Sequence, residues 1–229
     1  MTWLPLPVAQ LRRRAYNAKS SKDRHDTAYF AWEVSVRLAV AAAPPKDVSP
    51  LRRGSIGQWV SALKVPEGRI EQRSLAECYR LLCEEAGTDA KTQGRSIKGR
   101  ELLDTLPAYR HAVVGQGSKR SATFYQDAGD ILLAALDAAW EAELFLPPAG
   151  KMLFVGQVAR QEDSDQRRAH VLDLTGESPR VLAQGGTAVG AGIEPHRLYW
   201  RTGDQWRSLY PWLLFDEETE RLFCFHGPG

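Results

Sequence analysis

The spacing of apolar residues changes near residue 148, and this change constrains the fold more than any other feature of the chain. Before it, apolar side chains recur every three or four residues, as on a helix with one buried face. After it, short runs of alternating character are separated by Gly, Asp and Ser, as in strands joined by turns. The pattern predicts an α+β protein, with a helical bundle over residues 1–148 and a small antiparallel β unit over residues 149–229.

Five segments of the first part are predicted to be helices, namely residues 20–45, 55–65, 73–87, 97–110 and 122–148. The first is the strongest, because Ala28, Trp32 and Val36 follow one another on a single face. Ser20 stands three residues before Asp23, so we expect it to cap the start of this helix. Two consecutive prolines are expected to end it.

The other helices carry their own end signals. Gly87 is expected to be the C-terminal cap of the third helix, because glycine readily adopts the left-handed backbone conformation found there. Pro107 is expected to break the fourth helix after one or two turns. The prolines at positions 147 and 148 are expected to end the fifth.

The second part is predicted to contain short strands at residues 151–160, 168–175, 179–184 and 196–201, followed by a hairpin over residues 211–225. Residues 183–195, AQGGTAVGAGIEP, are rich in glycine but lack the Gly-Lys-Ser/Thr ending of a phosphate-binding loop. We therefore expect a flexible connection there.

Composition excludes several classes of protein. A net charge of +2 is too small to indicate a nucleic-acid-binding protein, so the local basic clusters are interpreted as solvated surface. The three cysteines, Cys78, Cys83 and Cys224, have no partners at zinc-site spacing and are expected to be small buried side chains in a reducing compartment. No segment has the pattern of a signal peptide or the roughly 18 consecutive apolar residues of a membrane span. We therefore expect a cytoplasmic protein without membrane contact, metal or cofactor.

Candidate chemistry is concentrated in residues 108–120, AYRHAVVGQGSKR, which the pattern places in a turn between two helices. Arg110 and His111 are adjacent there, and a cation with an imidazole can cleave RNA without a metal ion. The other charged cluster, Arg24 to Asp26, stands in the first turn of the strongest helix and is expected to be a salt-bridged cap. Motifs of kinases, metalloproteases, hydrolases and dinucleotide-binding proteins are absent from the sequence.

The order of these features resembles the HEPN superfamily of bacterial defence and toxin proteins. The shared features are a long N-terminal helix, a helical bundle, and an arginine a few residues before a final long helix. In members that are ribonucleases, the arginine is followed by a polar residue and, a few residues later, by a histidine, and two protomers form one site. The resemblance therefore implies a helical bundle and allows both a homodimer and RNA as a partner.

A closer resemblance extends over nearly the whole chain, including the β part. The segments AKSSKDRHDTAYFAWEVSVRLA, GSIGQWVSAL, YRHAVVGQG, FYQDAGDILLAAL, LTGESPR and SLYPWLLFDEETERLFCF are similar to a module at the N-terminal side of bacterial serine/threonine kinases and other multidomain signalling proteins. In that module the turn often reads arginine-asparagine, two or three residues, then glycine-histidine-glycine. Here Arg110 matches the arginine, His111 has the place of the polar neighbour, and Gln116 has the place of the histidine.

The glutamine decides between the interpretations, because it cannot exchange a proton near neutral pH. We interpret the chain as a non-catalytic recognition or regulatory module of a bacterial signalling or conflict system, which binds a ligand or a protein partner such as a kinase or another effector. Arg110, Lys119 and Arg120 are the predicted binding residues. One alternative is a dimeric, metal-independent endoribonuclease that uses Arg110 with His111. A second alternative is a nucleic-acid-binding adaptor without catalysis, which requires the basic clusters to merge into one face.

Overall fold

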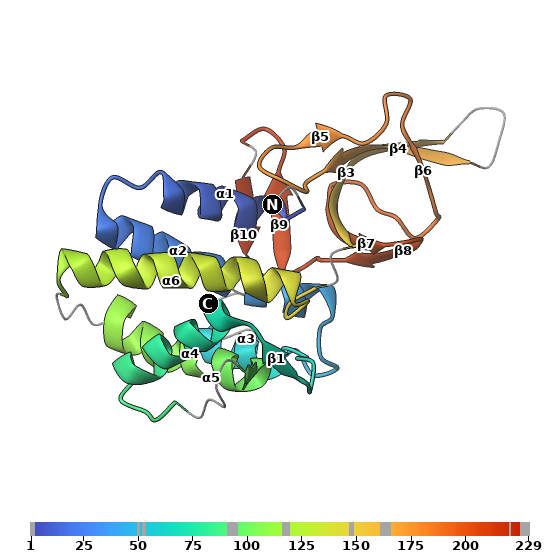
Figure 1. Ribbon diagram of the computed structural model, residues 1–229. Coiled ribbons are helices and arrows are strands. Elements are labelled where there is room, and N and C mark those ends of the chain that lie inside the picture. Colours follow the sequence, from blue (N-terminus) through green and yellow to red (C-terminus); the bar gives the residue numbers. More distant parts are fainter. Residues whose placement is uncertain are drawn as a thin grey trace. The chain divides into compact units, whose positions relative to one another are not determined.

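A computed structural model describes residues 3–49, 51, 54–90, 96–115, 120–146, 149–160, 166–219 and 221–224, and Figure 1 shows its ribbon. The protein is α+β, a helical region followed by an antiparallel sheet, as the change of period predicts. It forms two compact units, Leu11–Leu146 and Met1–Gln10 with Pro147–Gly229. We call these the helical unit and the sheet unit. Residues 3–10, which the predicted boundary placed with the helices, group with the sheet.

The helices are α1 (Leu6–Tyr16), α2 (Ser21–Ala42), α3 (Ile56–Ala62), α4 (Arg73–Glu85), α5 (Gly99–Tyr109) and α6 (Ala122–Glu141). A π-helix, η2 (Arg110–Gly115), directly continues α5. Two short strands, β1 (Arg69–Glu71) and β2 (Ser96–Lys98), form an antiparallel pair within the helical unit. No helix of the described chain is long and apolar enough to cross a membrane.

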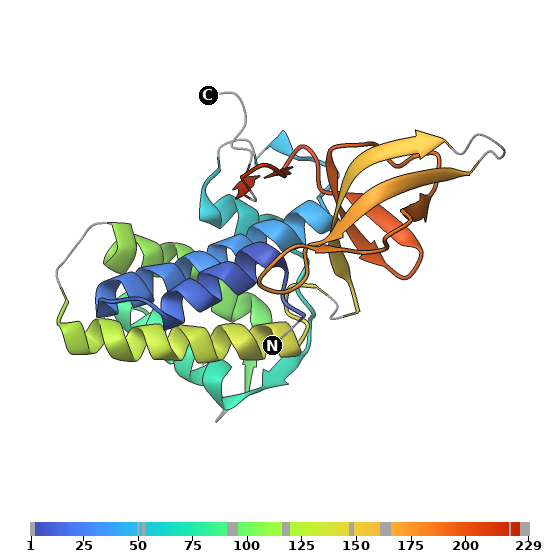
Figure 2. The ribbon, with the colours of Figure 1, turned by 90° about the horizontal axis from the view of Figure 1, so that it is seen from above.

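The centre of the helical unit is the contact between α2 and α6, which lie side by side in Figure 2. Their large indole rings are buried, and each ring nitrogen has an acceptor. Trp32 donates to the carbonyl of Leu132 at 3.0 Å, and Trp140 donates to the hydroxyl of Ser35 at 3.0 Å. Because a buried polar group without a partner is costly, these two bonds allow tryptophan to fill the core.

The predicted helix ends are partly confirmed. The hydroxyl of Ser20 accepts from the backbone N–H of Asp23 at 3.1 Å, so it caps α2 as expected. Gly87 follows the end of α4 with a φ of 69°, and Thr88 N–H donates to the carbonyl of Cys83 at 2.9 Å. This is the Schellman arrangement, and it confirms Gly87 as the residue that closes the helix.

Two predicted helix ends are wrong. Helix α5 continues through Pro107, because a proline costs a helix roughly 3 kcal/mol whereas each large apolar side chain on its buried face contributes about 1.5–3 kcal/mol. Helix α6 ends at Glu141, before the prolines at 147 and 148, which lie outside the described residues. Its end is another Schellman arrangement, in which Glu143 has a φ of 57° and Leu144 N–H donates to the carbonyl of Ala139 at 2.9 Å.

The cysteines are consistent with the expected packing where they are described. Cys78 and Cys83 lie on α4 as buried free thiols. Burial raises the pKa of the Cys78 thiol, so this side chain stays protonated and unreactive. Strand β10 (Arg221–Cys224) includes Cys224, but the side chain of this residue lies outside the described part of the structure.

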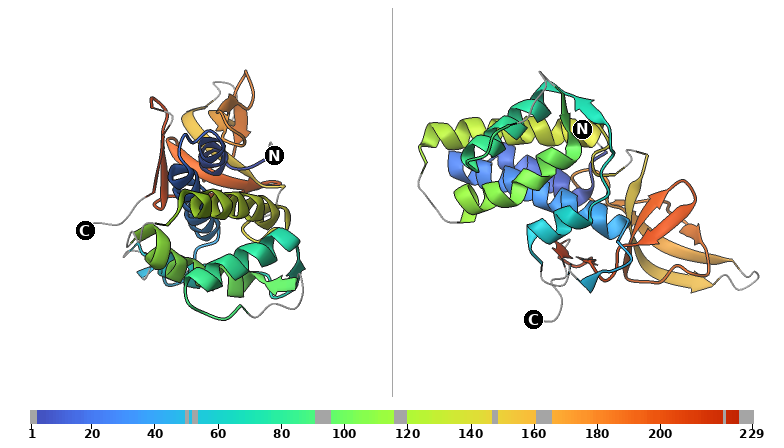
Figure 3. Two further views of the ribbon diagram at one scale, coloured as in Figure 1. Left: turned by 60° about the vertical axis from the view of Figure 1, so that its left-hand side comes forward. Right: turned by 90° about the horizontal axis from the view of Figure 1, so that it is seen from below.

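The sheet unit contains a six-stranded antiparallel sheet with the order β5-β4-β3-β7-β8, in which β6 also pairs with β4. Its strands are β3 (Lys151–Arg160), β4 (Arg167–Asp173), β5 (Arg180–Val181), β6 (Thr187–Val189), β7 (Arg197–Thr202) and β8 (Gln205–Ser208). The sheet is strongly curved (Figures 1 and 3). Strands β9 (Leu213–Asp216) and β10 form the predicted hairpin.

The sheet has a small apolar core of Leu153, Val155, Ala169, Val171, Ile193 and Tyr199. At one end of β3, Gly150 packs directly on the indole of Trp200. A Cβ atom at position 150 would lie 2.3 Å from Cζ2 of that ring, so only glycine fits without movement of the tryptophan.

The glycine-rich segment 183–195 is more ordered than predicted, because it contains β6 and two arginines of β4 hold its backbone. The guanidinium of Arg167 donates to the carbonyls of Gly190, Ala191 and Ile193 at 3.1, 2.5 and 2.9 Å. The neighbouring Arg168 donates to the carbonyl of Gly185 at 3.0 Å. These bonds come from a neighbouring strand, so the local sequence of the loop gave no sign of them.

Candidate functional site

The candidate segment 108–120 is not a turn over its described part. Residues 108 and 109 end α5, and Arg110–Gly115 form η2. A π-helix is rare, and such segments are frequent at functional sites. Gln116 and Lys119, two of the predicted site residues, lie outside the described residues.

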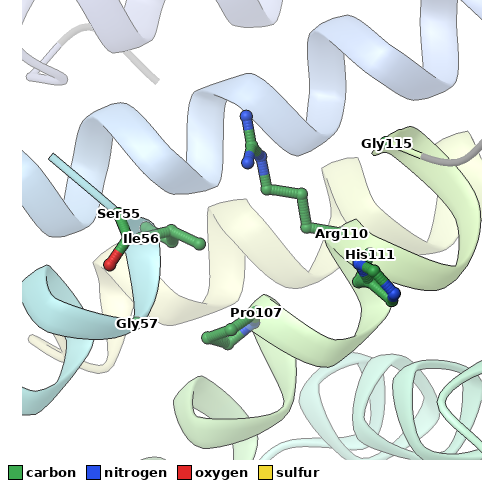
Figure 4. A pocket seen from close by; sticks show the side chains of 7 residues that line it. All are labelled: Ser55, Ile56, Gly57, Pro107, Arg110, His111 and Gly115. Atoms are coloured by element: carbon green, nitrogen blue, oxygen red, sulfur yellow. The ribbon is translucent and has the colours of Figure 1, made fainter.

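A pocket of about 380 Å³ lies beside η2 in the helical unit. Its described lining residues are Ser55, Ile56, Gly57, Pro107, Arg110, His111 and Gly115 (Figure 4). The pocket therefore lies between the start of α3 and the junction of α5 with η2. The fold brings two of the predicted residues, Arg110 and His111, to the edge of one cavity.

The side chain of Arg110 extends from η2 toward α2 (Figure 4). Its Nε atom lies 2.8 Å from Oε1 of Glu33, and the two form an ion pair. The Glu33 side chain is only 10% exposed, whereas the Arg110 side chain is 49% exposed. The buried carboxylate thus orients a guanidinium whose terminal nitrogens have no hydrogen-bond partner among the described residues.

The environment of Glu33 opposes its ionisation. Burial raises the pKa of this carboxyl above its ordinary value of 4.5, although the positive charges of Arg110 and Arg37 lower it. The nearby phenol of Tyr29 donates to the carbonyl of Leu106 at 2.9 Å, and burial raises its pKa as well. Tyr29 therefore stays protonated and is not a general base.

The side chain of His111 points in another direction than that of Arg110. It is exposed and borders the pocket, but Figure 4 shows its ring turned away from the guanidinium. Among the described residues that line this pocket, it is the single imidazole. The arrangement offers a cation and an imidazole at two different edges of the cavity.

Arg120, the remaining predicted binding residue, is engaged elsewhere. Its Nη2 atom donates to Oε2 of Glu85 at 2.7 Å, and its guanidinium lies 5.7 Å from the ring centre of Phe124. Arg120 is not among the described residues that line the pocket.

A buried polar network was missed by sequence reasoning. His25 is fully buried, with Nδ1 2.8 Å from Oδ1 of Asp26 and Nε2 2.7 Å from the hydroxyl of Tyr109. Asp26 also pairs with Lys22, and Arg24 pairs with Asp130, so both charged residues of the Arg24–Asp26 cluster form ion pairs as expected. His25 precedes Ala28 by three residues and therefore lies on the buried face of α2. This helical spacing is the sequence feature that could have predicted its burial.

The network favours one charge state of Asp26. Burial raises the pKa of this carboxyl, but the hydrogen bonds from His25 and Lys22 lower it more, so the pKa lies below its ordinary value of 3.8. Burial raises the pKa of the Tyr109 phenol, which keeps its proton. The network is a set of satisfied internal bonds, closed to solvent at His25 and Tyr109.

Comparison of the chain with protein-family models, curated proteins and solved structures finds no match. Within the described ranges, no group of three or more His, Cys, Asp or Glu residues could hold a metal ion. The candidate site therefore rests on its own geometry, a pocket with a guanidinium and an imidazole at its edges.

Proposed function

We propose that the helical unit is a non-catalytic recognition module that binds a partner protein at the pocket bordered by Arg110 and His111. The observation that carries the proposal is the ion pair between Arg110 and the buried Glu33. It holds the cation against α2 and partly neutralises it, while the remaining edge of the guanidinium is free to bind a ligand.

A ribonuclease makes a different demand on these residues. To cleave RNA without a metal ion, a cation and a base must act on the same phosphate and its attacking hydroxyl. Arg110 and His111 border the same pocket, which favours a ribonuclease, but the ring of His111 is turned away from Arg110. The position that matches the catalytic histidine of the HEPN pattern is Gln116, which has no exchangeable proton near neutral pH.

The biological setting of the proposal comes from the sequence resemblance. The six segments that resemble a module of bacterial kinases and other signalling proteins support a role in a signalling or conflict system. The partner would then be a kinase or another effector.

Catalysis is tested by incubating RNA with the purified protein in a chelator. The wild type, Arg110→Ala and Gln116→His are compared, with circular dichroism to show that each is folded. We expect no cleavage by the wild type. Cleavage by the wild type that disappears in a folded Arg110→Ala variant would overturn the proposal and make the protein an enzyme.

Binding is tested by placing a photoreactive amino acid at Ser55, which is exposed at the pocket edge and makes no side-chain cap bond. Glu67, which is exposed and does not line the pocket, provides the matched control. We expect a discrete protein adduct in host cells from position 55 and none from position 67. Equal labelling from both positions, or none from either, would contradict recognition at this pocket.

A further inference from the structure

A second pocket adjoins the first one. It has a volume of about 360 Å³ and is lined by Pro45, Asp47, Gly57, Gln58, Ser61 and Ala62. Gly57 borders both cavities, so they lie on either side of one residue without a side chain. We call the two together the α3 groove.

The two ends of the α3 groove differ in charge. Arg110 and His111 stand at one end and Asp47 stands at the other. Asp47 accepts from the backbone N–H of Ser49 at 3.0 Å and also from its hydroxyl. These bonds lower the pKa of the Asp47 carboxyl, which is therefore ionised at neutral pH. A ligand that fits both ends carries an acidic group and a basic group.

A residue that lines the second pocket has an acceptor without a donor in the described part of the chain. The side-chain oxygen of Gln58 is buried and has no hydrogen-bond partner among the described residues, and Gln58 lines the second pocket. A buried acceptor without a donor is unusual in a folded protein. The oxygen is closed to solvent, so an N–H group of a ligand in the groove can satisfy it only when the Gln58 side chain turns toward the groove.

The lining residues favour a peptide over a nucleic acid. The described residues of the groove include no Phe, Tyr or Trp on which a base could stack. The carboxylate of Asp47 would repel a second phosphate of an RNA strand. Small and apolar side chains, such as Ile56, Pro107 and Ala62, suit the backbone and short side chains of a protein segment.

We propose that the α3 groove binds an extended segment of the partner protein, with an acidic side chain at Arg110 and a basic side chain at Asp47. The segment's backbone passes over Gly57, and one of its N–H groups binds the Gln58 oxygen when this side chain turns toward the groove. This inference rests on the proposed function, because it names the kind of partner that the recognition module takes.

The test uses a library of labelled peptides of about nine residues, which span about 30 Å when extended. Peptides are selected on the purified full chain, and their affinities are measured by fluorescence anisotropy. We expect the selected peptides to share one acidic and one basic residue at a fixed spacing. Absence of any peptide that binds better than its scrambled version would overturn the inference.

Two variants test the groove without unfolding the protein. A Cβ atom at Gly57 would lie 3.7 Å from Pro107, an ordinary contact, so Gly57→Leu places a side chain over the groove and should weaken binding at least about tenfold. Gly68→Leu is the matched control, because a Cβ atom there meets nothing within 4 Å and Gly68 is not a lining residue. Equal affinity in the two variants would show that the peptides bind elsewhere.

Charge is tested at Asp47. The Asp47→Asn variant keeps an acceptor for Ser49 and loses the negative charge, so we expect the preference for a basic peptide residue to disappear. Asp47→Lys should convert it into a preference for an acidic residue. Unchanged preferences in both variants would contradict the assigned orientation.

The inference and the proposed function fail in different ways. An adduct from position 55 with no peptide selected would mean that the partner docks as a folded surface, so the inference fails and the function stands. Displacement of selected peptides by a uridine oligonucleotide would replace the peptide with a nucleic-acid ligand. RNA cleavage by the wild type would overturn the function itself.

Discussion

Replacing Tyr109 with phenylalanine should lower the free energy of unfolding of the helical unit by about 1–3 kcal/mol. The substitution removes one hydroxyl and keeps the ring, so it creates almost no cavity. It leaves Nε2 of His25 without its partner at 2.7 Å, in a site where both residues are fully buried. The expected magnitude is the cost of one buried polar group that water cannot reach.

Urea unfolding followed by the helical circular dichroism signal measures this change. With a slope of about 2 kcal/mol per molar urea, the midpoint should fall by about 0.5–1.5 M while the slope stays constant. Tyr125→Phe is the matched control. The Tyr125 ring centre lies 5.2 Å from that of His25, but its hydroxyl has no hydrogen-bond partner among the described residues.

The comparison between the two variants decides the result. A loss in Tyr109→Phe that equals the loss in Tyr125→Phe would show that the bond to His25 makes no net contribution. In the neutral ring, the carboxylate of Asp26 accepts from Nδ1–H and the hydroxyl of Tyr109 donates to Nε2. A loss of less than about 0.5 kcal/mol would refute this account of the buried network.

Two other predictions concern the ion pair and the sheet. Because the folded pKa of Glu33 lies above 4.5, the unit loses stability as the pH rises above this value. The excess stability of the wild type over Glu33→Gln should therefore be smaller at about pH 7 than at about pH 4, measured by urea unfolding; an excess that grows with pH would contradict the raised pKa. Gly150→Ala should destabilise the sheet unit by about 1–3 kcal/mol, because the new Cβ displaces Trp200. Tryptophan fluorescence during unfolding measures this loss, and an unchanged midpoint would show that the ring moves freely.

The fold class could be predicted from the sequence because each helix or strand must bury one face. The spacing of the apolar residues on that face is about 3.6 in a helix and 2 in a strand. Local signals also fixed some ends, such as Ser20 and Gly87, whose side chain or lack of one determines the cap. Glu143 closes α6 with the same backbone conformation as Gly87, but nothing in a glutamate indicates a left-handed φ. The continuation of α5 through Pro107 could not be predicted for a related reason. The packing that outweighs the cost of the proline is made with other segments of the chain, so the local sequence does not show it.

The candidate site was predictable only in part. An adjacent arginine and histidine between two helical segments drew attention to Arg110 and His111, and both border a pocket. Their structural partners come from distant segments. Glu33 lies on α2 among residues whose pattern indicates a buried face, and no local feature connects it with Arg110. The pocket beyond Gly57 lies between α3 and the residues that follow α2, Pro45 and Asp47, and no local feature of the sequence predicts it.

The hydrogen bonds from Arg167 and Arg168 to segment 183–195 determine which positions of this part of the chain can change. Both guanidinium groups bind carbonyl oxygens, which every amino acid has, and none of these bonds uses a loop side chain. Apart from Gly186, whose φ of 79° favours glycine, the loop can therefore exchange its side chains without losing its anchorage where the backbone geometry is kept. The two arginines cannot be exchanged so freely, because lysine lacks the planar fork that reaches several carbonyls together. Such a loop can diverge rapidly among related chains while the strand that anchors it stays constant.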